Sequence, residues 1–336
     1  MPAPAAAALP PYRPPAGFGS ATLQTVWASR VRRVAGVAYR RETLALPDGD
    51  VLELDHVEPD ARGRPGHVAV VAHGLEGSSD RTYVRGMARA LARRGWAVVA
   101  WNLRGCGGTP NRLLRAYHSG ATEDLAAVVA HVVAGGARRV GLVGFSLGGN
   151  LTLKYAADAG AGIDPRIVGA VGISVPVDLA GSAAVMERPS RRPYMALFLR
   201  SLVAKAEEKA VRFPDAPSTA GLRAMRTFRE FDERFTAPVH GFASAADYWA
   251  RASALPVLGQ IRVPTLLANA LDDPFLSPSC YPTRVGNPSL SVLTPRRGGH
   301  VGFVARGGEY WSETVAGRWL DACAAQAYSA ATGSET

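Results

Sequence analysis

The sequence predicts an α/β fold in which a mostly parallel sheet is flanked by helices on both faces. Two observations predict it: short, continuous apolar runs recur along the chain, and segments with helical spacing separate them. Strands that are apolar along their whole length are buried on both faces, which is typical of parallel sheets covered by helices. With 336 residues, of which 47% are hydrophobic, the chain can form a large core within one domain.

The expected elements begin with a hairpin. Two alternating runs, 41–46 and 51–55, flank a Pro-Asp-Gly turn, as in an antiparallel pair of strands. The later elements are inferred from apolar runs and from capping residues, such as Thr122 at a helix start and Gly135 at its end. The expected strands are 67–72, 96–101, 139–143, 167–174, 264–270 and 290–294, and the expected helices are 81–94, 122–134, 150–158 and 309–325.

The alternation is interrupted once, after the expected sixth strand. From about 179 to 258 the chain has helical spacing and is rich in Arg, Met and aromatic residues. We expect this segment to be a helical lid inserted into a single domain of residues 17–326. The Pro/Ala-rich residues 1–16 are expected to be a disordered tail, and residues 327–336 a C-terminal tail.

A serine flanked by glycines lies between a predicted strand and a predicted helix. The string Gly-Phe-Ser-Leu-Gly at 144–148 directly follows an apolar, β-branched run. In this context G-x-S-x-G is typical of a nucleophile elbow, a sharp turn that lifts the serine hydroxyl clear of the sheet. The free amides of the following helix lie where an oxyanion would form. We expect Ser146 to be a nucleophile.

A nucleophilic serine needs a histidine base, and the base needs a carboxylate that fixes its tautomer. In folds with such an elbow the chain order is serine, acid, histidine. Of the seven histidines only His240 and His300 follow Ser146. His300 lies in a glycine-rich loop after the last predicted strand, whereas His240 lies in the expected lid. We therefore expect His300 to be the base.

The acid is expected just past the strand 264–270, where Asp272 and Asp273 are adjacent. Asp273 lies nine residues beyond Pro264, the usual spacing in this fold, and is the expected acid. Asp272 stays the alternative acid; if it is not catalytic, it is a turn residue that caps the Asp-Asp-Pro corner. Asp178, after the sixth strand, is a weaker candidate for the acid, and its other expected role is to anchor the lid.

Two backbone amides are expected to hold an oxyanion. One is the N–H of Leu147, and the other is the N–H of Leu75 in the loop His-Gly-Leu-Glu-Gly after the strand 67–72. His73 begins that loop, and we expect it to be structural. Cys106 is expected to be a small buried apolar residue.

Charge and cysteine content exclude several classes of protein. The net charge is +10, but the basic residues are spread along the chain and almost all are arginine, which argues against a nucleic-acid partner. Association with an anionic membrane surface stays open. Three widely spaced cysteines argue against a disulfide framework or a zinc site and favour a reducing, cytoplasmic compartment. No apolar run reaches the roughly 18 residues of a membrane helix.

The motifs together resemble the YheT-like branch of the α/β hydrolases, over about 17–320. The strings that carry the resemblance are 73–78 (His-Gly-Leu-Glu-Gly-Ser), 104–112 (Arg-Gly-Cys-Gly-Gly-Thr-Pro-Asn-Arg), 117–120, 144–150, 272–275 and 298–303. The resemblance implies an α/β-hydrolase fold with Ser146, Asp273 and His300 as the charge-relay residues. This branch includes bacterial proteins classed as esterases, animal phospholipases and yeast medium-chain acyl-ester synthases. It implies carboxylic-ester chemistry on acyl chains, with no cofactor.

The functional expectation is a serine hydrolase of acyl or lipid-like esters, and the alternative is an acyltransferase that passes the acyl group to an alcohol. A non-enzymatic binding protein is disfavoured by the intact set of three residues, and haloalkane or epoxide chemistry by the lack of an elbow aspartate. Two sets of side chains have open roles. The first set either contacts the polar part of the ester or only stabilises the loop by hydrogen bonds within the protein. It comprises Arg104, Asn111, Arg112, Tyr117 and His118. The second set either lines a tunnel for the acyl chain or belongs to the hydrophobic core. It comprises Met186, Tyr194, Met195, Leu197 and Phe198.

Overall fold

The computed structural model describes residues 3–4, 9–60, 63–282 and 285–332. Within them, the centre is an eight-stranded sheet with the strand order β1-β2-β4-β3-β5-β6-β7-β8. β2 is antiparallel to β1 and to β4, and all other neighbours are parallel, which confirms the expected mostly parallel sheet. The strands are β1 (Arg40–Ala45), β2 (Val51–Val57), β3 (His67–Ala72), β4 (Ala97–Asn102), β5 (Arg139–Phe145), β6 (Ile167–Ile173), β7 (Thr265–Ala268) and β8 (Leu290–Leu293).

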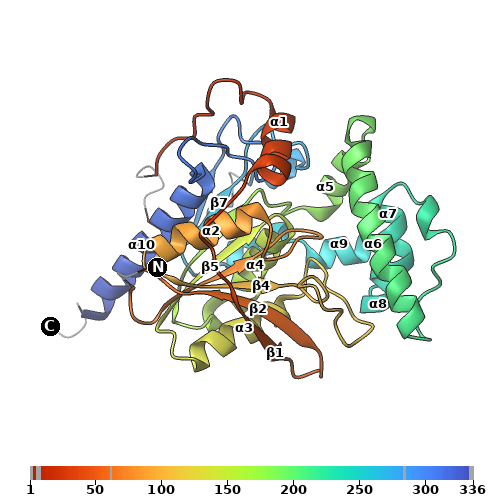
Figure 1. The fold of residues 1–336 in the computed structure, drawn as a ribbon, viewed down its shortest axis with the longest axis horizontal. Coiled ribbons are helices and arrows are strands. Elements are labelled where there is room, and N and C mark those ends of the chain that lie inside the picture. The colour runs from red at the N-terminus through yellow and green to blue at the C-terminus, as the bar shows by residue number, and fades with distance from the viewer. Residues whose placement is uncertain (1–2, 5–8, 61–62, 283–284, 333–336) are drawn as a thin grey trace.

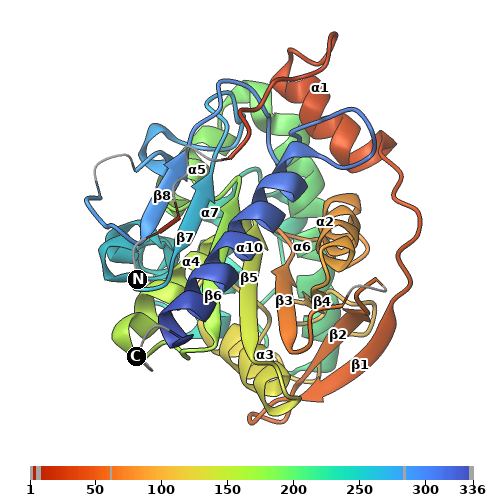
Figure 2. The ribbon, with the colours of Figure 1, turned by 90° about the vertical axis from the view of Figure 1, so that its left-hand side faces the viewer.

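Helices cover both faces of the sheet (Figures 1 and 2). One face packs against α2 (Thr82–Arg93) and α10 (Trp311–Thr332), and the other against α3 (Thr122–Ala134) and α4 (Leu147–Ala159). Because side chains alternate along a strand, β3 contributes to both cores: Val70 faces α3 and α4, and Val71 faces α2 and α10. The continuous apolar strands in the sequence are therefore buried on both sides.

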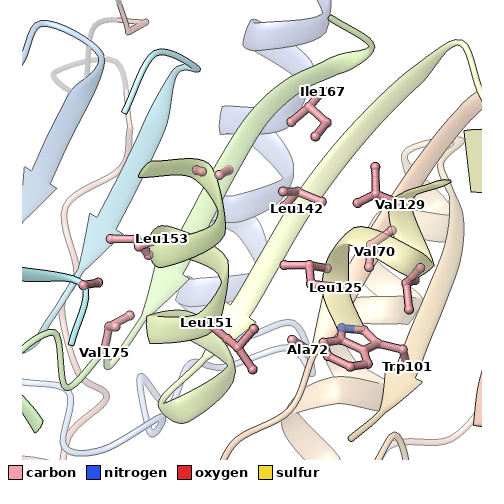
Figure 3. Close-up of a cluster of buried hydrophobic side chains, with 14 of the residues drawn as sticks. Val70, Ala72, Trp101, Leu125, Val129, Leu142, Leu151, Leu153, Ile167 and Val175 are labelled. Carbon is pink, nitrogen blue, oxygen red and sulfur yellow. The ribbon is translucent and has the colours of Figure 1, made fainter. Parts of the chain in front are cut away.

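Figure 3 shows the core beneath α3 and α4. Leu125 and Val129 of α3 and Leu151 of α4 contact the apolar side chains of the central strands, and all of them are almost fully buried. This packing fixes the start of α4 against the carboxyl end of β5. The turn that carries Ser146 is thus held by the core itself.

The segment between β6 and β7 is helical, and Figure 1 shows it beside the sheet. It has apolar cores of its own, one of which includes Met195, Leu199 and Phe235. Its helices are α5 (Leu179–Met186), α6 (Arg192–Arg212), α7 (Phe228–Phe231), α8 (Ala237–His240) and α9 (Ala245–Ala252).

The N-terminal residues differ from the expectation of a disordered tail over 1–16. The Tyr12 hydroxyl donates to the carbonyl of Val304 at 2.9 Å, and the Trp311 indole N–H donates to the carbonyl of Pro10 at 2.7 Å. The Tyr12 ring also contacts Phe303. Proline fixes the backbone before folding, so ordering this segment loses little entropy. Residues 1–2 and 5–8 lie outside the described residues.

Two further boundaries differ from expectation. α10 continues to Thr332, so residues 327–332 of the expected C-terminal tail are helical, while 333–336 lie outside the described residues. Thr122 is the first residue of α3 and does not cap it, because the N-cap position belongs to Ala121. α1 (Ala21–Val26), which is followed by a π-helical turn over Trp27–Val31, was not among the expected helices.

Candidate active site

The turn between β5 and α4 holds Ser146 in an unusual conformation. Its φ is 51° and its ψ is −118°, a region that non-glycine residues rarely occupy. Close backbone packing explains the flanking glycines. A Cβ on Gly144 would lie 2.2 Å from the carbonyl oxygen of Gly148, and one on Gly148 would lie 2.3 Å from the carbonyl oxygen of His73. The elbow pattern thus follows from steric exclusion at both positions.

The structure brings Ser146, His300 and Asp273 together. His300 Nε2 lies 2.9 Å from Ser146 Oγ, and His300 Nδ1 lies 2.8 and 3.1 Å from the two carboxylate oxygens of Asp273. This network assigns a proton to Nδ1, which donates to the carboxylate, and leaves Nε2 to accept from the serine hydroxyl. The Asp273 side chain is fully buried, so its interaction with the imidazole is weakly screened.

Asp272, the alternative acid, points elsewhere. Its Oδ1 accepts a hydrogen bond of 2.9 Å from the backbone N–H of Gly299, next to His300. Its Oδ2 is buried without a hydrogen-bond partner among the described residues. Burial, together with repulsion from Asp273, raises the pKa of Asp272. Asp272 therefore supports the histidine loop and has no contact with the imidazole ring nitrogens.

The two other rivals have different partners, although His240 lines the same cavity as Ser146. His240 packs against His118 in the helical insertion, with ring centroids 4.6 Å apart. Asp178 is the N-cap of α5, where its carboxylate accepts from the N–H of Gly181 and from the hydroxyl of Ser279. Asp178 thus joins the start of the insertion to the segment that follows β7.

Two side chains that the sequence did not single out hold the histidine loop. The backbone N–H of His300 donates to Thr25 Oγ1, and the N–H of Val301 donates to Ser174 Oγ, both at 2.9 Å. Thr25 lies on α1, far from His300 in the sequence. The Gln-Thr pair among the apolar Leu23, Val26 and Trp27 is the one local hint of a buried, hydrogen-bonded face there.

The loop after β3 carries Leu75, one of the two expected oxyanion donors. Leu147, the other, is the first residue of α4, so its N–H precedes the helical hydrogen-bond ladder. Both residues line the cavity that contains Ser146 and His300. The loop is held against α2, because the N–H of Gly74 donates to the Tyr83 hydroxyl at 3.1 Å.

His73 has a structural role in this loop. It is fully buried, its Nδ1 donates to the carbonyl of Gly74 at 2.7 Å, and its Nε2 accepts from the N–H of Leu103 at 3.1 Å. Both ring nitrogens are therefore used in binding the backbone of two loops. Burial lowers the pKa of His73 from 6.5 to about 4, which keeps the ring neutral.

This shift predicts an acid-sensitive loop. Because the pKa of His73 is lower in the folded than in the unfolded chain, its contribution to stability is complete above pH 6.5 and is lost as the pH falls towards 4. We expect His73→Gln, whose amide does not titrate, to flatten the pH dependence of unfolding by up to about 1.4 kcal/mol per pH unit. Urea unfolding at several pH values measures this slope. An unchanged slope would show that other groups, such as His240, account for the acid sensitivity.

Glu76 joins the oxyanion loop to the helical insertion. Its carboxylate accepts from the hydroxyls of Tyr117 and Ser201 and from Lys205 Nζ, the last at 3.0 Å. Ser201 and Lys205 belong to α6. The residue itself has a positive φ of 52° and directly follows Leu75. The position of α6 is thus coupled to the backbone that carries one expected oxyanion donor.

The polar side chains of the loop after β4 form hydrogen bonds with the neighbouring elements. Arg104 forms two hydrogen bonds with Asp124, at 2.7 and 2.8 Å, and a further one with Asp50 at 3.0 Å. Asn111 donates to Asp50 and accepts from Lys209. These contacts favour a loop that locks its own shape, although Arg104, Asn111, Tyr117 and His118 also line the cavity.

The three cysteines are free thiols. Cys106 differs from the expected buried apolar residue, because it is only partly buried and accepts from Lys205 Nζ at 3.1 Å. Burial raises the pKa of Cys106 to about 11, so the thiol stays protonated and weakly nucleophilic.

A cavity of about 760 Å³ opens beside Ser146 and His300. Its lining includes Met186, Tyr194, Leu197 and Phe198 from the helical insertion, whereas Met195 points into the core of the insertion. The Tyr194 ring lies against Phe275, which in turn lies 4.4 Å from the imidazole of His300. One part of the cavity lining beside the serine is therefore apolar.

Comparison with known proteins gives matches over most of the chain. The profile of the alpha/beta hydrolase fold matches residues 69–303. The chain is 36% identical to "Putative esterase YheT" of Escherichia coli over 92% of both chains. It is 31% identical to "Phospholipase ABHD3" of Mus musculus over 80% of this chain and 67% of that protein. An esterase structure from Pyrococcus furiosus, Pf2001, covers 87% of this chain and 96% of its own with a TM-score of 0.56, but at 17% identity it bears on the fold alone.

No helix among the described residues is long and apolar enough to cross a membrane.

Proposed function

Because this chain belongs to the α/β-hydrolase family, and within it to the YheT-like branch, we propose that it cleaves carboxylic esters through an acyl-enzyme on Ser146. One observation carries the proposal. Ser146 Oγ, His300 and Asp273 form an unbroken hydrogen-bonded chain, and Ser146 and His300 line a cavity that apolar side chains of the insertion also line. Esterase and phospholipase relatives support an acyl or lipid-like ester as the substrate.

The first half of the proposed reaction forms the acyl-enzyme. Ser146 Oγ attacks the acyl carbon while His300 Nε2 takes the hydroxyl proton. The carbonyl oxygen becomes an oxyanion, which the N–H groups of Leu75 and Leu147 bind. Asp273 stabilises the imidazolium. His300 then gives its proton to the alcohol oxygen, and the carbon–oxygen bond to the leaving alcohol breaks.

The second half releases the acid. Water replaces the alcohol, His300 removes its proton, and the resulting oxygen attacks the acyl carbon of the ester on Ser146. Collapse of the second oxyanion returns the proton to Ser146 Oγ. An alcohol in place of that water would give a new ester by the same steps, which is the acyltransferase alternative.

The helical insertion over about 179–258 is proposed to act as a lid within the single domain 17–326. Side chains of the insertion line one wall of the cavity. The contacts of Ser201 and Lys205 with Glu76 tie the lid to the oxyanion loop. Association with an anionic lipid surface is a separate proposal that suits this substrate class, because acyl esters of low solubility concentrate in lipid.

A chain-length series tests the substrate class. We expect the kcat/KM for p-nitrophenyl esters to rise by about fourfold per methylene until the cavity is filled, since each buried methylene contributes about 0.8 kcal/mol. Phe198→Ala should reduce this slope, whereas Phe213→Ala, outside the cavity lining, should not. A preference for acetate over all longer chains would contradict an acyl channel. Added ethanol separates hydrolysis from acyl transfer by the ratio of acid to ethyl ester.

A further inference from the structure

The helical segment over residues 21–31 has its amphipathic faces reversed. Four large apolar side chains with helical spacing form what we term the apolar face, and each of them is exposed to solvent. Their exposed fractions are 40% for Leu23, 39% for Val26, 38% for Trp27 and 48% for Val31. A helix on a globular protein ordinarily turns such a face towards the core.

Polar residues occupy the inward face and hold it in place. Gln24, Thr25 and Arg32 are buried. Gln24 exchanges hydrogen bonds with Tyr12 and Phe18, and Thr25 accepts from His300. Arg32 forms a buried ion pair with Glu313. Turning the helix to bury its apolar face would leave these polar groups without partners, so the exposure of that face is built into the fold.

The apolar face borders the mouth of the cavity. Val26 belongs both to this face and to the cavity lining. On the opposite rim, Leu197 of α6 also lines the cavity and is 43% exposed. Figures 1 and 2 place α1 and the start of the helical insertion at the same end of the molecule. Exposed apolar side chains thus stand on both sides of the opening.

The two chain segments that contribute these apolar side chains are rich in arginine, and within them no residue is acidic, although Glu187 and Glu207 flank the second. Residues 1–41 contain six arginines and no Asp or Glu, and the stretch 188–206 also contains neither acid. Arg30 and Arg33 are exposed beside the apolar face, and Arg200 is exposed on the other rim. Apolar side chains framed by arginines complement a surface that is apolar within and anionic at its boundary.

We propose that the apolar face and its arginines dock on an anionic lipid surface, with the mouth of the cavity directed towards the lipid. Leu23, Trp27 and Val31 enter the boundary between head groups and acyl chains, and Arg30 and Arg33 pair with lipid phosphates. A second copy of this chain is a poorer occupant, because two such faces would bring their arginines together. The passage of an acyl ester into the cavity rests on the proposed function, whereas the docking does not.

Co-sedimentation with phosphatidylglycerol vesicles and with phosphatidylcholine vesicles tests the docking, on Ser146→Ala protein so that ester cleavage plays no part. We expect binding to the anionic vesicles that weakens with salt. Arg30→Gln/Arg33→Gln should weaken it by about thirtyfold, from about 1 kcal/mol per arginine. Leu23→Ser/Val31→Ser should weaken it by about tenfold. Val211→Ser, at an 88% exposed position far along α6, should bind as the parent does.

Quenching of tryptophan fluorescence by brominated lipids measures directly whether Trp27 enters the lipid, which a change in folding alone would not mimic. These lipids should quench part of the tryptophan fluorescence, and Trp27→Phe should remove that part while binding is kept. Melting temperatures identify any variant that fails to fold. Equal binding by all variants, or no binding to anionic vesicles, would overturn the proposal. So would light scattering that shows a dimer dispersed by Leu23→Ser/Val31→Ser. Vesicle binding without ester cleavage would count against the proposed function alone.

Discussion

Ser146→Ala is expected to lower the kcat for a p-nitrophenyl ester by about five orders of magnitude or more, as the loss of a nucleophilic serine does in other serine hydrolases. The remaining amides and His300 can still bind the ester, but no acyl-enzyme forms. The residual rate should therefore show no burst of p-nitrophenol.

A fluorophosphonate probe measures the same step independently of turnover. Wild-type protein should be labelled once, on the peptide that contains Ser146, and Ser146→Ala should not be labelled. Ser218→Ala, at an exposed loop position, is the matched control and should label as the wild type does. Equal labelling of wild type and Ser146→Ala would rule out Ser146 as the nucleophile.

Asp273→Asn is expected to lower kcat by about ten-thousand-fold, because an amide that donates to His300 Nδ1 selects the wrong tautomer and stabilises no imidazolium. Asp272→Asn should change kcat by only about threefold. Its amide oxygen can still accept from the N–H of Gly299, and a neutral group replaces a carboxyl whose pKa burial raises.

The adjacent pair thus forms its own control, since both substitutions are isosteric and lie in one turn. Steady-state kinetics across pH 6–9 on the two variants, with melting temperatures for folding, make the comparison. A larger loss in Asp272→Asn than in Asp273→Asn would transfer the role of the acid to Asp272.

The sequence predicted the sheet well because its strands carry their own signal. Val70 and Val71 lie in a run that is apolar on both sides, and only a strand between two helical layers buries such a run. The glycines around Ser146 predicted the elbow equally well, since close backbone contacts at Gly144 and Gly148 leave no space for a side chain. Chain order then brought His300 and Asp273 into consideration.

Other features carried no local signal. The choice between Asp272 and Asp273 depends on which carboxylate turns towards the imidazole. Because both residues are aspartates and are adjacent in the chain, their residue type and immediate surroundings do not distinguish them. Glu76 gains its partners Ser201 and Lys205 only when α6 folds over the loop. The helix over residues 21–26 was not expected, and only the packing of the neighbouring segments decides that its apolar side chains are exposed.

The sequence by itself determined where most strands and helices follow one another along the chain, and the elbow at Ser146. The spacing of apolar residues and the steric need for glycine both act over only a few residues. Only the tertiary structure decided which polar atoms meet. Hydrogen bonds between Thr25 and His300, or between His73 and Leu103, join segments far apart in the chain. Their geometry follows from how the layers pack, and packing is a property of the whole folded chain.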